Sequence, residues 1–381
     1  MDSRTSSPAA AAAAPLLPDD LLLEILLRLP PEPTYLFRAS FVSKHWRGLV
    51  HDAGFLRRFR DFHGGTPPVI GFLRKHGGPP LFLPTSGGFA VSTPTMSDVG
   101  RSVLDCRHGR ALLHSRRSST LLVWDPMTTE EHYLPLPTLT CPGDFQCNAV
   151  VLCAADHADH NDCHSRPFLV VLVCTSLRDL ITFACVYSSE TRVWGVWGEI
   201  TSSHIPDSYV RGEPRPPLVG NTLYWLLANH HIVGFDLDKH SFDLVEKVPH
   251  VYYQTILVSA EDELGCAGVD GFSLHFWSRV ASIDGSVTWT RRRVVDLEKL
   301  LAAEVVAACM LPVEPVGYAE DADVIFIYVD PGTYMIRLKS MQITEVSDKG
   351  PYTHIFPYTS FYRPGITGGA GEDQAELLNG T

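Results

Sequence analysis

The residues best suited to chemistry gather in one polar stretch between positions 153 and 164. Soft and hard metal ligands occur there within twelve residues, namely Cys153, Asp156, His157, Asp159, His160, Asp162, Cys163 and His164. A closed zinc site requires four ligands that converge tetrahedrally, and the spacing His157-x-x-His160-x-x-Cys163-His164 matches no established zinc pattern. We therefore interpret the stretch as a solvated surface insertion, and we predict no metal site and no cofactor.

Other catalytic patterns are missing, or lie where they would support the backbone. The sequence contains no G-x-x-x-x-G-K-[ST] phosphate loop, no H-E-x-x-H helix and no G-x-S-x-G elbow. Aspartate recurs at Asp125, Asp236, Asp284 and Asp330, but each lies in a predicted turn, where its carboxylate accepts hydrogen bonds from its own backbone. We predict no catalytic residues and expect the chain not to be an enzyme.

Composition and charge narrow the class of protein further. The 381 residues carry a formal charge of −12, and 45% are hydrophobic and 19% charged, as in a folded globular protein. The acidic balance disfavours an extended nucleic-acid surface, and no apolar run approaches the about 18 residues that a membrane helix requires. The nine cysteines contain no C-x-x-C pair and predict reduced thiols in a cytoplasmic or nuclear protein. We expect a soluble protein with neither nucleic acid nor a membrane as partner.

A change in pattern near residue 65 divides the chain. Residues 1 to 65 contain eight Lys/Arg and seven Asp/Glu, a net charge of +1, which leaves −13 for the remainder. Only residues 16 to 62 show sustained helical periodicity. We predict a first helix, ended by prolines, with one apolar face formed by Leu21, Leu22, Ile25, Leu26 and Leu29. We predict a second helix over Thr34 to Phe41, a third capped by Ser43, and a short fourth near Phe55.

The helical segment resembles the F-box motif of plant F-box proteins. The residues that match in order and spacing are Leu17 to Pro30, Arg38, Val42, Ser43, Lys44, Trp46, Arg47 and Phe55. The sequence departs from the family at Ser43, where a cysteine is frequent, and in the proline-rich link Pro30-Pro31-Glu32-Pro33. The resemblance implies docking on the Skp-type adaptor of an SCF ubiquitin ligase, and through that adaptor on a cullin.

We predict an apolar docking surface, because leucine and isoleucine side chains on one helix face can enter a partner's groove and a tryptophan can anchor them. The candidate residues are Leu17, Pro18, Leu21, Leu22, Ile25, Leu26, Val42 and Trp46. Some of these leucines must instead form the core of the helical segment itself, and the sequence leaves that partition open.

Beyond residue 65, apolar strands alternate with turn clusters at a near-constant spacing. The turns that begin at Trp124, Tyr187, Phe235, Ile283 and Val329 are separated by 63, 48, 48 and 46 residues, and the long interval contains the polar insertion 154–166. A period near 48 with short strands is typical of propeller blades. It predicts about six blades, with an evenly spaced β-sandwich as the alternative. The helical spacing over Asp296 to Leu311 does not fit a strand.

The second region also resembles the β-propeller-like domains that follow plant F-boxes, in the segments Leu274 to Ser278 and Arg293 to Leu300. We therefore predict a multidomain α+β chain: a disordered tail over 1–15, an F-box module over 16–62, an all-β propeller-like domain over 66–362, and a second disordered tail over 363–381. The predicted function is substrate recognition for an SCF-type ligase, with an unknown target protein. The alternatives are a propeller enzyme with a central-channel site, and an F-box protein that acts outside a ligase.

Overall fold

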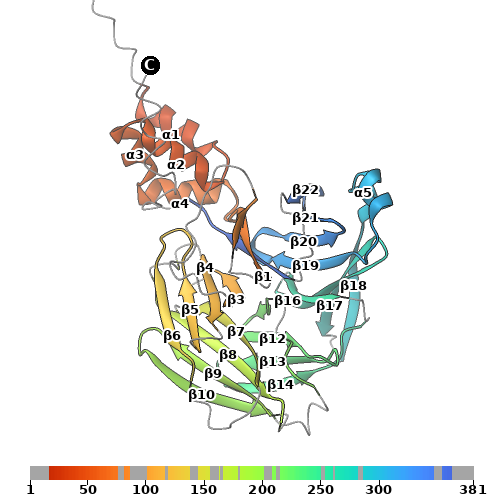
Figure 1. Cartoon of the computed structure of the whole chain (residues 1–381). Coiled ribbons are helices and arrows are strands. Elements are labelled where there is room, and N and C mark those ends of the chain that lie inside the picture. The colour runs from red at the N-terminus through yellow and green to blue at the C-terminus, as the bar shows by residue number, and fades with distance from the viewer. Residues whose placement is uncertain are drawn as a thin grey trace, which may run out of the picture.

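The computed structural model describes residues 17–75, 81–85, 101–115, 119–137, 145–154, 163, 166–178, 181–200, 208–211, 215–249, 254–260, 262–281, 286–346 and 354–362. A module of four helices stands beside a ring of six antiparallel sheets (Figure 1). The two predicted tails lie outside these residues. Within the described part of the chain, no helix is both long and apolar enough to cross a membrane.

The helical module consists of α1 (Asp19–Leu27), α2 (Pro33–Val42), α3 (Lys44–Val50) and α4 (Ala53–Phe62). At the start of α3, the Ser43 hydroxyl accepts a hydrogen bond from the Trp46 amide at 3.1 Å. The Asp52 carboxylate caps α4 in the same way, accepting from the Phe55 amide at 2.8 Å. Each cap satisfies a backbone donor that the first turn leaves without a helical partner. The four predicted helices, and the cap at Ser43, are confirmed.

The remaining chain forms a six-bladed β-propeller, as predicted. Five blades are four-stranded meanders. Blade 1 comprises β3 (Arg101–Arg107), β4 (Arg110–Ser115), β5 (Thr120–Trp124) and β6 (Glu131–Pro135), and blade 2 comprises β7 (Phe145–Cys153), β8 (Phe168–Ser176), β9 (Thr182–Ser188) and β10 (Val193–Ile200). Blade 3 comprises β11 (Leu218–Val219), β12 (Thr222–Leu226), β13 (Ile232–Asp236) and β14 (Ser241–Val245). Blade 4 comprises β15 (Thr255–Ala260), β16 (Glu263–Asp270), β17 (Ser273–Ala281) and β18 (Val287–Asp296), and blade 5 comprises β19 (Glu314–Ala319), β20 (Val324–Val329), β21 (Gly332–Arg337) and β22 (Gln342–Val346).

The position of a strand within its blade explains its sequence pattern. The second strands β8 and β20 are almost entirely buried, because a neighbouring blade covers each face, and both are continuous apolar runs. The outermost strands β14 and β22 mix exposed polar residues with apolar ones, as expected for strands with one free edge. The sequence-based prediction of a buried strand over Phe168 to Cys174 is confirmed by β8.

The two ends of the propeller meet in one closing blade. This three-stranded sheet has the order β2 (Phe82–Pro84), β1 (Val69–Lys75), β23 (His354–Thr359), so that its strands come from both ends of the domain. The register pairs Val69 with Thr359 and Lys75 with His354. A ring closed by hydrogen bonds between its first and last segments has no exposed edge at the junction, which stabilises it against opening.

The helical module and the propeller share a continuous apolar core. Leu26, Phe55 and Phe59 belong to the same cluster of buried side chains as Phe361 and Tyr362, the two residues that end the described chain after β23. The Tyr362 hydroxyl lies 2.9 Å from His51 Nε2. The chain therefore returns from the closing blade to the helices, and the two units pack against each other.

Three of the five predicted turns are confirmed at equivalent positions of their blades, and a fourth lies outside the described residues. The turns at Trp124, Tyr187, Phe235 and Ile283 each fall between the third and fourth strands of a blade, the last at residues 282–285, outside the described residues. The fifth turn, Val329 to Gly332, is present but is not equivalent to the others, because it joins the second and third strands, β20 and β21. Asp-Pro-Gly chemistry suits any tight hairpin, so composition alone did not reveal which hairpin of the blade it served.

Two further segments differ from a regular blade. The helical spacing over Asp296 to Leu311 corresponds to a 3-10 turn (Leu297–Lys299) and the helix α5 (Ala303–Ala308), which connect blade 4 to blade 5. The expectation that all nine cysteines are reduced is wrong, because Cys147 and Cys174 form a disulfide between β7 and β8. These residues are direct cross-strand partners, which the sequence did not disclose.

Candidate functional site

Helix α1 has two opposite faces with different degrees of burial. Leu22, Leu26 and Leu27 are buried in the core of the module, at 2%, 0% and 5% exposure. Leu17, which precedes the helix, and Leu21 and Ile25 on the other face are 51%, 54% and 49% exposed. Since residues four apart lie one above the other on a helix, Leu21 and Ile25 form a row on α1, and together with Leu17, just before the helix, we call them the α1 apolar row. An exposed row of this kind is a candidate protein-binding surface.

The structure divides the predicted docking residues into three groups. Leu17, Pro18, Leu21, Ile25 and Val42 are exposed. Trp46 is half-buried and packs on the core of the module, so that one part of its ring remains at the surface. Leu22 and Leu26 are core residues of the module and have no surface to offer a partner in this conformation.

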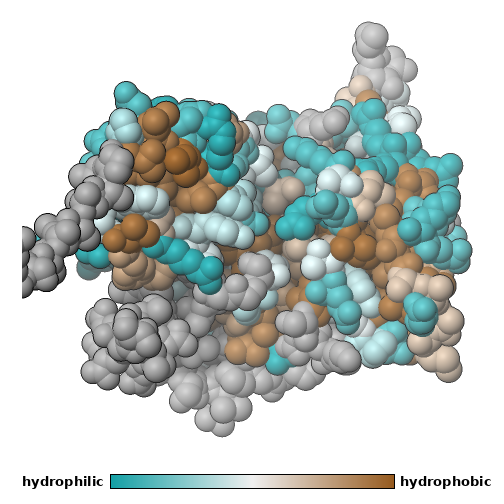
Figure 2. Space-filling model, turned by 90° about the horizontal axis from the view of Figure 1, so that it is seen from above, coloured by the Kyte–Doolittle hydropathy of each residue, from teal (hydrophilic) through white to brown (hydrophobic). Residues whose placement is uncertain are grey.

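The sequence analysis missed other exposed apolar residues of the module. Phe41 is 64% exposed beside Val42 at the end of α2, and its ring contacts Phe37 edge-on with centroids 4.8 Å apart. Tyr35 is also exposed, at 42%. Figure 2 shows hydrophobic groups exposed on the helical module. The available signal was the pair of large apolar residues directly before the Ser43 cap, where a helix ends and side chains are readily exposed.

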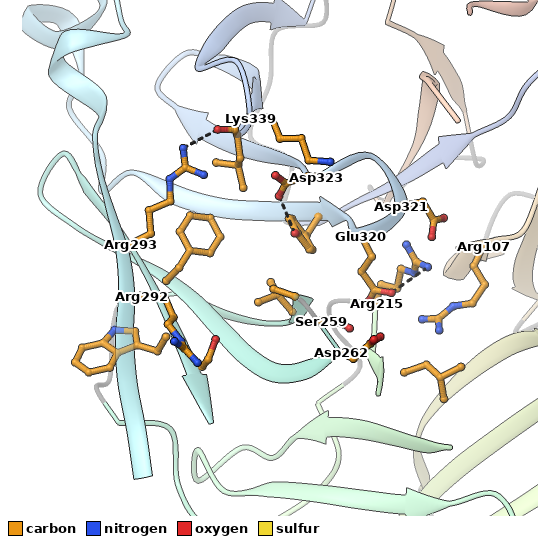
Figure 3. Close-up of a pocket in the computed structure, with 18 of the residues that line it drawn as sticks. Arg107, Arg215, Ser259, Asp262, Arg292, Arg293, Glu320, Asp321, Asp323 and Lys339 are labelled. Carbon is orange, nitrogen blue, oxygen red and sulfur yellow. Dashed lines mark hydrogen bonds and ion pairs between the residues drawn. The ribbon is translucent and has the colours of Figure 1, made fainter. Parts of the chain in front are cut away.

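A second candidate site is a cavity of about 910 Å³ in the propeller. Its residues come from blades 1, 3, 4 and 5, and Figure 3 shows Arg107, Arg215 and Glu320 on one side of it, with Arg292 and Arg293 on the other. The cavity lies at the ends of the innermost strands β3, β15 and β19. The innermost strand of the closing blade, β23, ends on the same face before its chain reaches the helical module.

A hydrogen bond between β23 and the β3–β4 turn also shows that the cavity and the end of β23 lie on the same face of the ring. The Tyr358 hydroxyl near the end of β23 donates a hydrogen bond to the Gly109 carbonyl in the β3–β4 turn, at 3.2 Å. Arg107, which lines the cavity, ends β3 just before that turn. The cavity and the helical module therefore lie on the same face of the ring.

Four charged side chains from three blades form an ion network at one wall of the cavity. Asp105, which is fully buried, lies with Oδ2 3.2 Å from Arg107 Nε and with Oδ1 3.8 Å from Arg215 Nε. Arg215 Nη2 is in turn 3.7 Å from Glu320 Oε2. The Asp105 carboxylate also accepts a hydrogen bond from the Val151 amide at 3.0 Å, and Arg107 Nη2 donates to the Pro216 carbonyl at 2.5 Å. The network thus joins blades 1, 2, 3 and 5.

Burial and ion pairing oppose each other in this network: although burial lowers the pKa of Arg215, the neighbouring Glu320 and Asp105 carboxylates together raise it. Burial lowers the pKa of Arg107, although the neighbouring Asp105 carboxylate opposes the change. It raises the pKa of Glu320, with the Arg215 guanidinium opposing. Burial also raises the pKa of the Cys106 thiol, and the Asp105 charge acts in the same direction, so Cys106 is a protonated core thiol and not a nucleophile.

Two of the four recurring aspartates support turns as predicted, whereas Asp330 Oδ1 accepts a hydrogen bond from the Tyr328 hydroxyl at 3.0 Å. Asp125 Oδ1 accepts hydrogen bonds from the Met127 and Thr128 amides at 2.8 and 3.3 Å. Asp236 Oδ1 accepts from the amides of Asp238 and Lys239 at 3.0 and 2.9 Å. Neither carboxylate is among the residues that line the cavity. Asp284 lies outside the described residues.

The polar insertion 154–166 connects β7 to β8, and most of it lies outside the described residues. Of the candidate ligands between positions 153 and 164, the structure describes Cys153 and the buried Cys163, whose carbonyl accepts a hydrogen bond from Arg110 Nη2. Among the described residues of the whole chain, no three His, Cys, Asp or Glu side chains cluster as metal ligands would. The predicted absence of a metal therefore stays a prediction for the insertion itself.

Comparison with known proteins gives two family matches. Residues 15–58 match the F-box domain, and residues 102–365 match the family described as "F-box protein AT5G49610-like, beta-propeller". The chain is 27% identical over 256 residues to "Putative F-box protein At3g16210" of Arabidopsis thaliana, a match that covers 64% of this chain and 63% of that relative. The chain thus spans less than two thirds of the length of this relative.

Similar solved structures are distant. A protein of unknown function from Desulfotomaculum acetoxidans aligns with a TM-score of 0.40 at 10% identity, covering 76% of this chain and 99% of that one. The WD40 domain of SCAP from fission yeast aligns with a TM-score of 0.36 at 12% identity, covering 72% and 60%. Similarity at this level carries no functional inference.

Proposed function

This chain belongs to the plant F-box proteins that carry a β-propeller, and from that premise we propose that it is a non-catalytic substrate receptor of an SCF-type ubiquitin ligase. The helical module would bind a Skp-type adaptor, and through it a cullin, while the propeller holds a target protein. The observation that carries the proposal is the α1 apolar row. Leu21 and Ile25 remain about half exposed on a helix whose other face is packed in the core, and Leu17, just before the helix, is exposed to the same extent.

The physical argument is one of burial. Moving an aliphatic side chain from water into a protein interface contributes about 1.5–3 kcal/mol, and Leu21 and Ile25 each have about half of that left to gain. Together they would contribute about 1.5–3 kcal/mol, which corresponds to about 10- to 150-fold in affinity. A charge at either position would in addition be desolvated without a partner.

The test is capture of a purified Skp-type adaptor by the full-length chain. We expect the double substitution Leu21→Asp with Ile25→Asp to weaken adaptor binding at least about 10-fold, while the thermal unfolding temperature changes little because both side chains are exposed. The matched control is Val193→Asp with Leu244→Asp, two exposed apolar residues on outer strands of the propeller, at 62% and 41% exposure. Equal adaptor binding by wild type and the α1 variant would contradict the proposed interface.

The burial of the Asp105 carboxylate in the ion network disfavours a catalytic role for the propeller. An acid–base residue must reach substrate, but Asp105 is fully buried behind Arg107 and Arg215.

The proposal that the chain acts within a ligase, and not as an F-box protein outside one, requires its own measurement. Reconstitution with the adaptor and a cullin should give one complex that contains all three proteins.

A further inference from the structure

The Arg215 side chain has no hydrogen-bonding partner that would explain its position. It retains 9% of its surface, lines the cavity, and makes no hydrogen bond with any described residue. Its contacts with Asp105 and Glu320 are ion pairs at 3.8 and 3.7 Å, longer than direct hydrogen bonds. A guanidinium carries five N–H donors in a planar fork, and buried donors are almost always paired.

The neighbouring arginine strengthens this observation. Arg107, on the adjoining part of the wall, donates through Nη2 to the Pro216 carbonyl, but its Nε lacks a hydrogen-bond partner among the described residues. Figure 3 shows both guanidinium groups at the same side of the cavity, beside Glu320. Two arginines are thus held in place by Asp105 from behind, with donors of Arg215 still open toward the cavity.

The geometry points to a carboxylate-recognition site: we propose that Arg215, supported by Arg107, binds a carboxylate of the target protein, either an acidic side chain or the chain terminus. The inference rests on the proposed function, because it assigns the target's contact to this cavity. A guanidinium fork matches the two oxygens of a carboxylate, and a partly buried site strengthens such charge-assisted bonds.

The other residues of the cavity favour a carboxylate over a phosphate. Among the described residues of the lining, five are cationic and four are acidic, namely Arg107, Arg215, Arg292, Arg293 and Lys339 against Asp262, Glu320, Asp321 and Asp323. The surplus is one positive charge, which a singly charged carboxylate neutralises and a doubly charged phosphate would reverse. Val258 and Phe276 line the same cavity and offer apolar surface to the methylene groups of a peptide.

The test is a titration of the full-length chain, labelled with ¹⁵N-arginine, by small probes followed through the arginine Nε–H signals. We expect sodium acetate to shift and saturate the Arg215 signal, and the isosteric neutral acetamide to leave it in place. Two peptides then distinguish the sources: Ac-Ala-Glu-Ala-amide offers only a side-chain carboxylate, and Ac-Ala-Ala-Ala-OH offers only a terminal one. Ac-Ala-Gln-Ala-amide is the neutral control.

Two variants with opposite expected effects keep the site testable if one of them fails to fold. Arg215→Lys keeps the charge but loses the planar fork, and should weaken acetate binding about tenfold. Glu320→Gln removes the carboxylate that competes for Arg215, and should therefore strengthen acetate binding. The matched control is Arg279→Lys. The Arg279 guanidinium does not line the cavity and pairs with Glu246 at 2.9 Å, so the acetate affinity of this variant should stay within about twofold of wild type.

The outcomes separate this site from the docking proposal. Equal effects of acetate and acetamide, unchanged acetate affinity in both variants, or tighter binding of inorganic phosphate than of acetate would each overturn the carboxylate site. Adaptor capture is measured on the same variants and should match wild type, since the cavity lies apart from the α1 apolar row. If the wild-type chain shows no acetate response but docks the adaptor, this inference alone is refuted, and if the wild-type chain responds to acetate but fails to dock, only the proposed function is refuted.

Discussion

The helical module and the propeller cavity depart from the usual distribution of side chains in opposite directions. The module exposes aliphatic residues, with Leu21 and Ile25 about half accessible, whereas the cavity wall buries charges, with Asp105 at 0% and Arg107 at 4% exposure. Exposed apolar surface gains free energy when a partner covers it. Buried charge is tolerated only where other charges and hydrogen bonds compensate its desolvation.

The contrast teaches that the two surfaces suit different kinds of recognition. An apolar row on a short helix binds through shape and burial, and suits a constant partner. A cavity with oriented guanidinium groups binds through charge and geometry, and suits selection of one chemical group among many. In this chain both surfaces lie on the same side of one propeller, joined by a common core that runs through Phe361 and Tyr362.

The largest expected effect concerns the buried charges. Asp105→Asn removes the charge that compensates Arg107 and Arg215 while preserving the shape of the side chain. We expect the free energy of unfolding to fall by about 3–5 kcal/mol, because Arg107 is left buried without its main counter-charge and Arg215 keeps only Glu320. Urea denaturation of wild type and variant measures this change in the free energy of unfolding. Asp270→Asn, at an exposed end of β16, is the control and should change stability by no more than about 0.5 kcal/mol. A loss below about 1 kcal/mol for Asp105→Asn would mean that the network does not hold the blades together.

The next effect compares two neighbours in α1. Leu26 is fully buried and Ile25 is 49% exposed. Leu26→Ala should lower the free energy of unfolding by about 2–5 kcal/mol through lost burial and the cavity left behind. Ile25→Ala should leave stability within about 1 kcal/mol of wild type and lower adaptor affinity instead. Thermal denaturation and adaptor titration of both variants check this. Similar stability losses in the two variants would show that α1 is not divided into a core face and a binding face.

The smallest effect is a pH dependence in the ion network. Burial raises the folded-state pKa of Glu320 above its ordinary value of 4.5. The folded protein therefore holds the Glu320 proton more tightly than the unfolded chain does, and this contribution to stability is present below about pH 4.5 and lost as the pH rises through the folded pKa. The stability of wild type relative to Glu320→Gln should accordingly fall as the pH is raised from about 4.5. The unfolding free energy of both proteins at several pH values tests this. A difference that grows with pH would mean that pairing with Arg215 outweighs desolvation.

Much of the fold was predictable from local pattern. Helix caps such as Ser43 act within a few residues, and the apolar run of β8 is buried because any second strand of a blade has covered faces. The non-equivalent turn at Val329 to Gly332 shows the limit of such reasoning. A turn sequence specifies a tight reversal, but which two strands it joins depends on the number of strands that precede it in the blade.

The candidate sites divide in the same way. The sequence suggested the α1 apolar row, because periodicity and motif lie within one helix, but it did not separate Ile25 from Leu26. That separation required the packing of α1 on the rest of the module. The carboxylate site left no pattern at all: Asp105, Arg215 and Glu320 are more than one hundred residues apart in sequence and come together only when the ring closes.

The sequence by itself determined the division into a helical module and a repeat domain, the helix caps and the buried strands, since these follow from interactions between near neighbours along the chain. Tertiary structure alone decided which apolar residues remain exposed, which cysteines join, and which charges meet at the cavity wall. Those outcomes depend on closing the propeller through β1 and β23, which brings distant segments into contact. Non-local contacts of this kind are set by the whole chain and not by any segment of it.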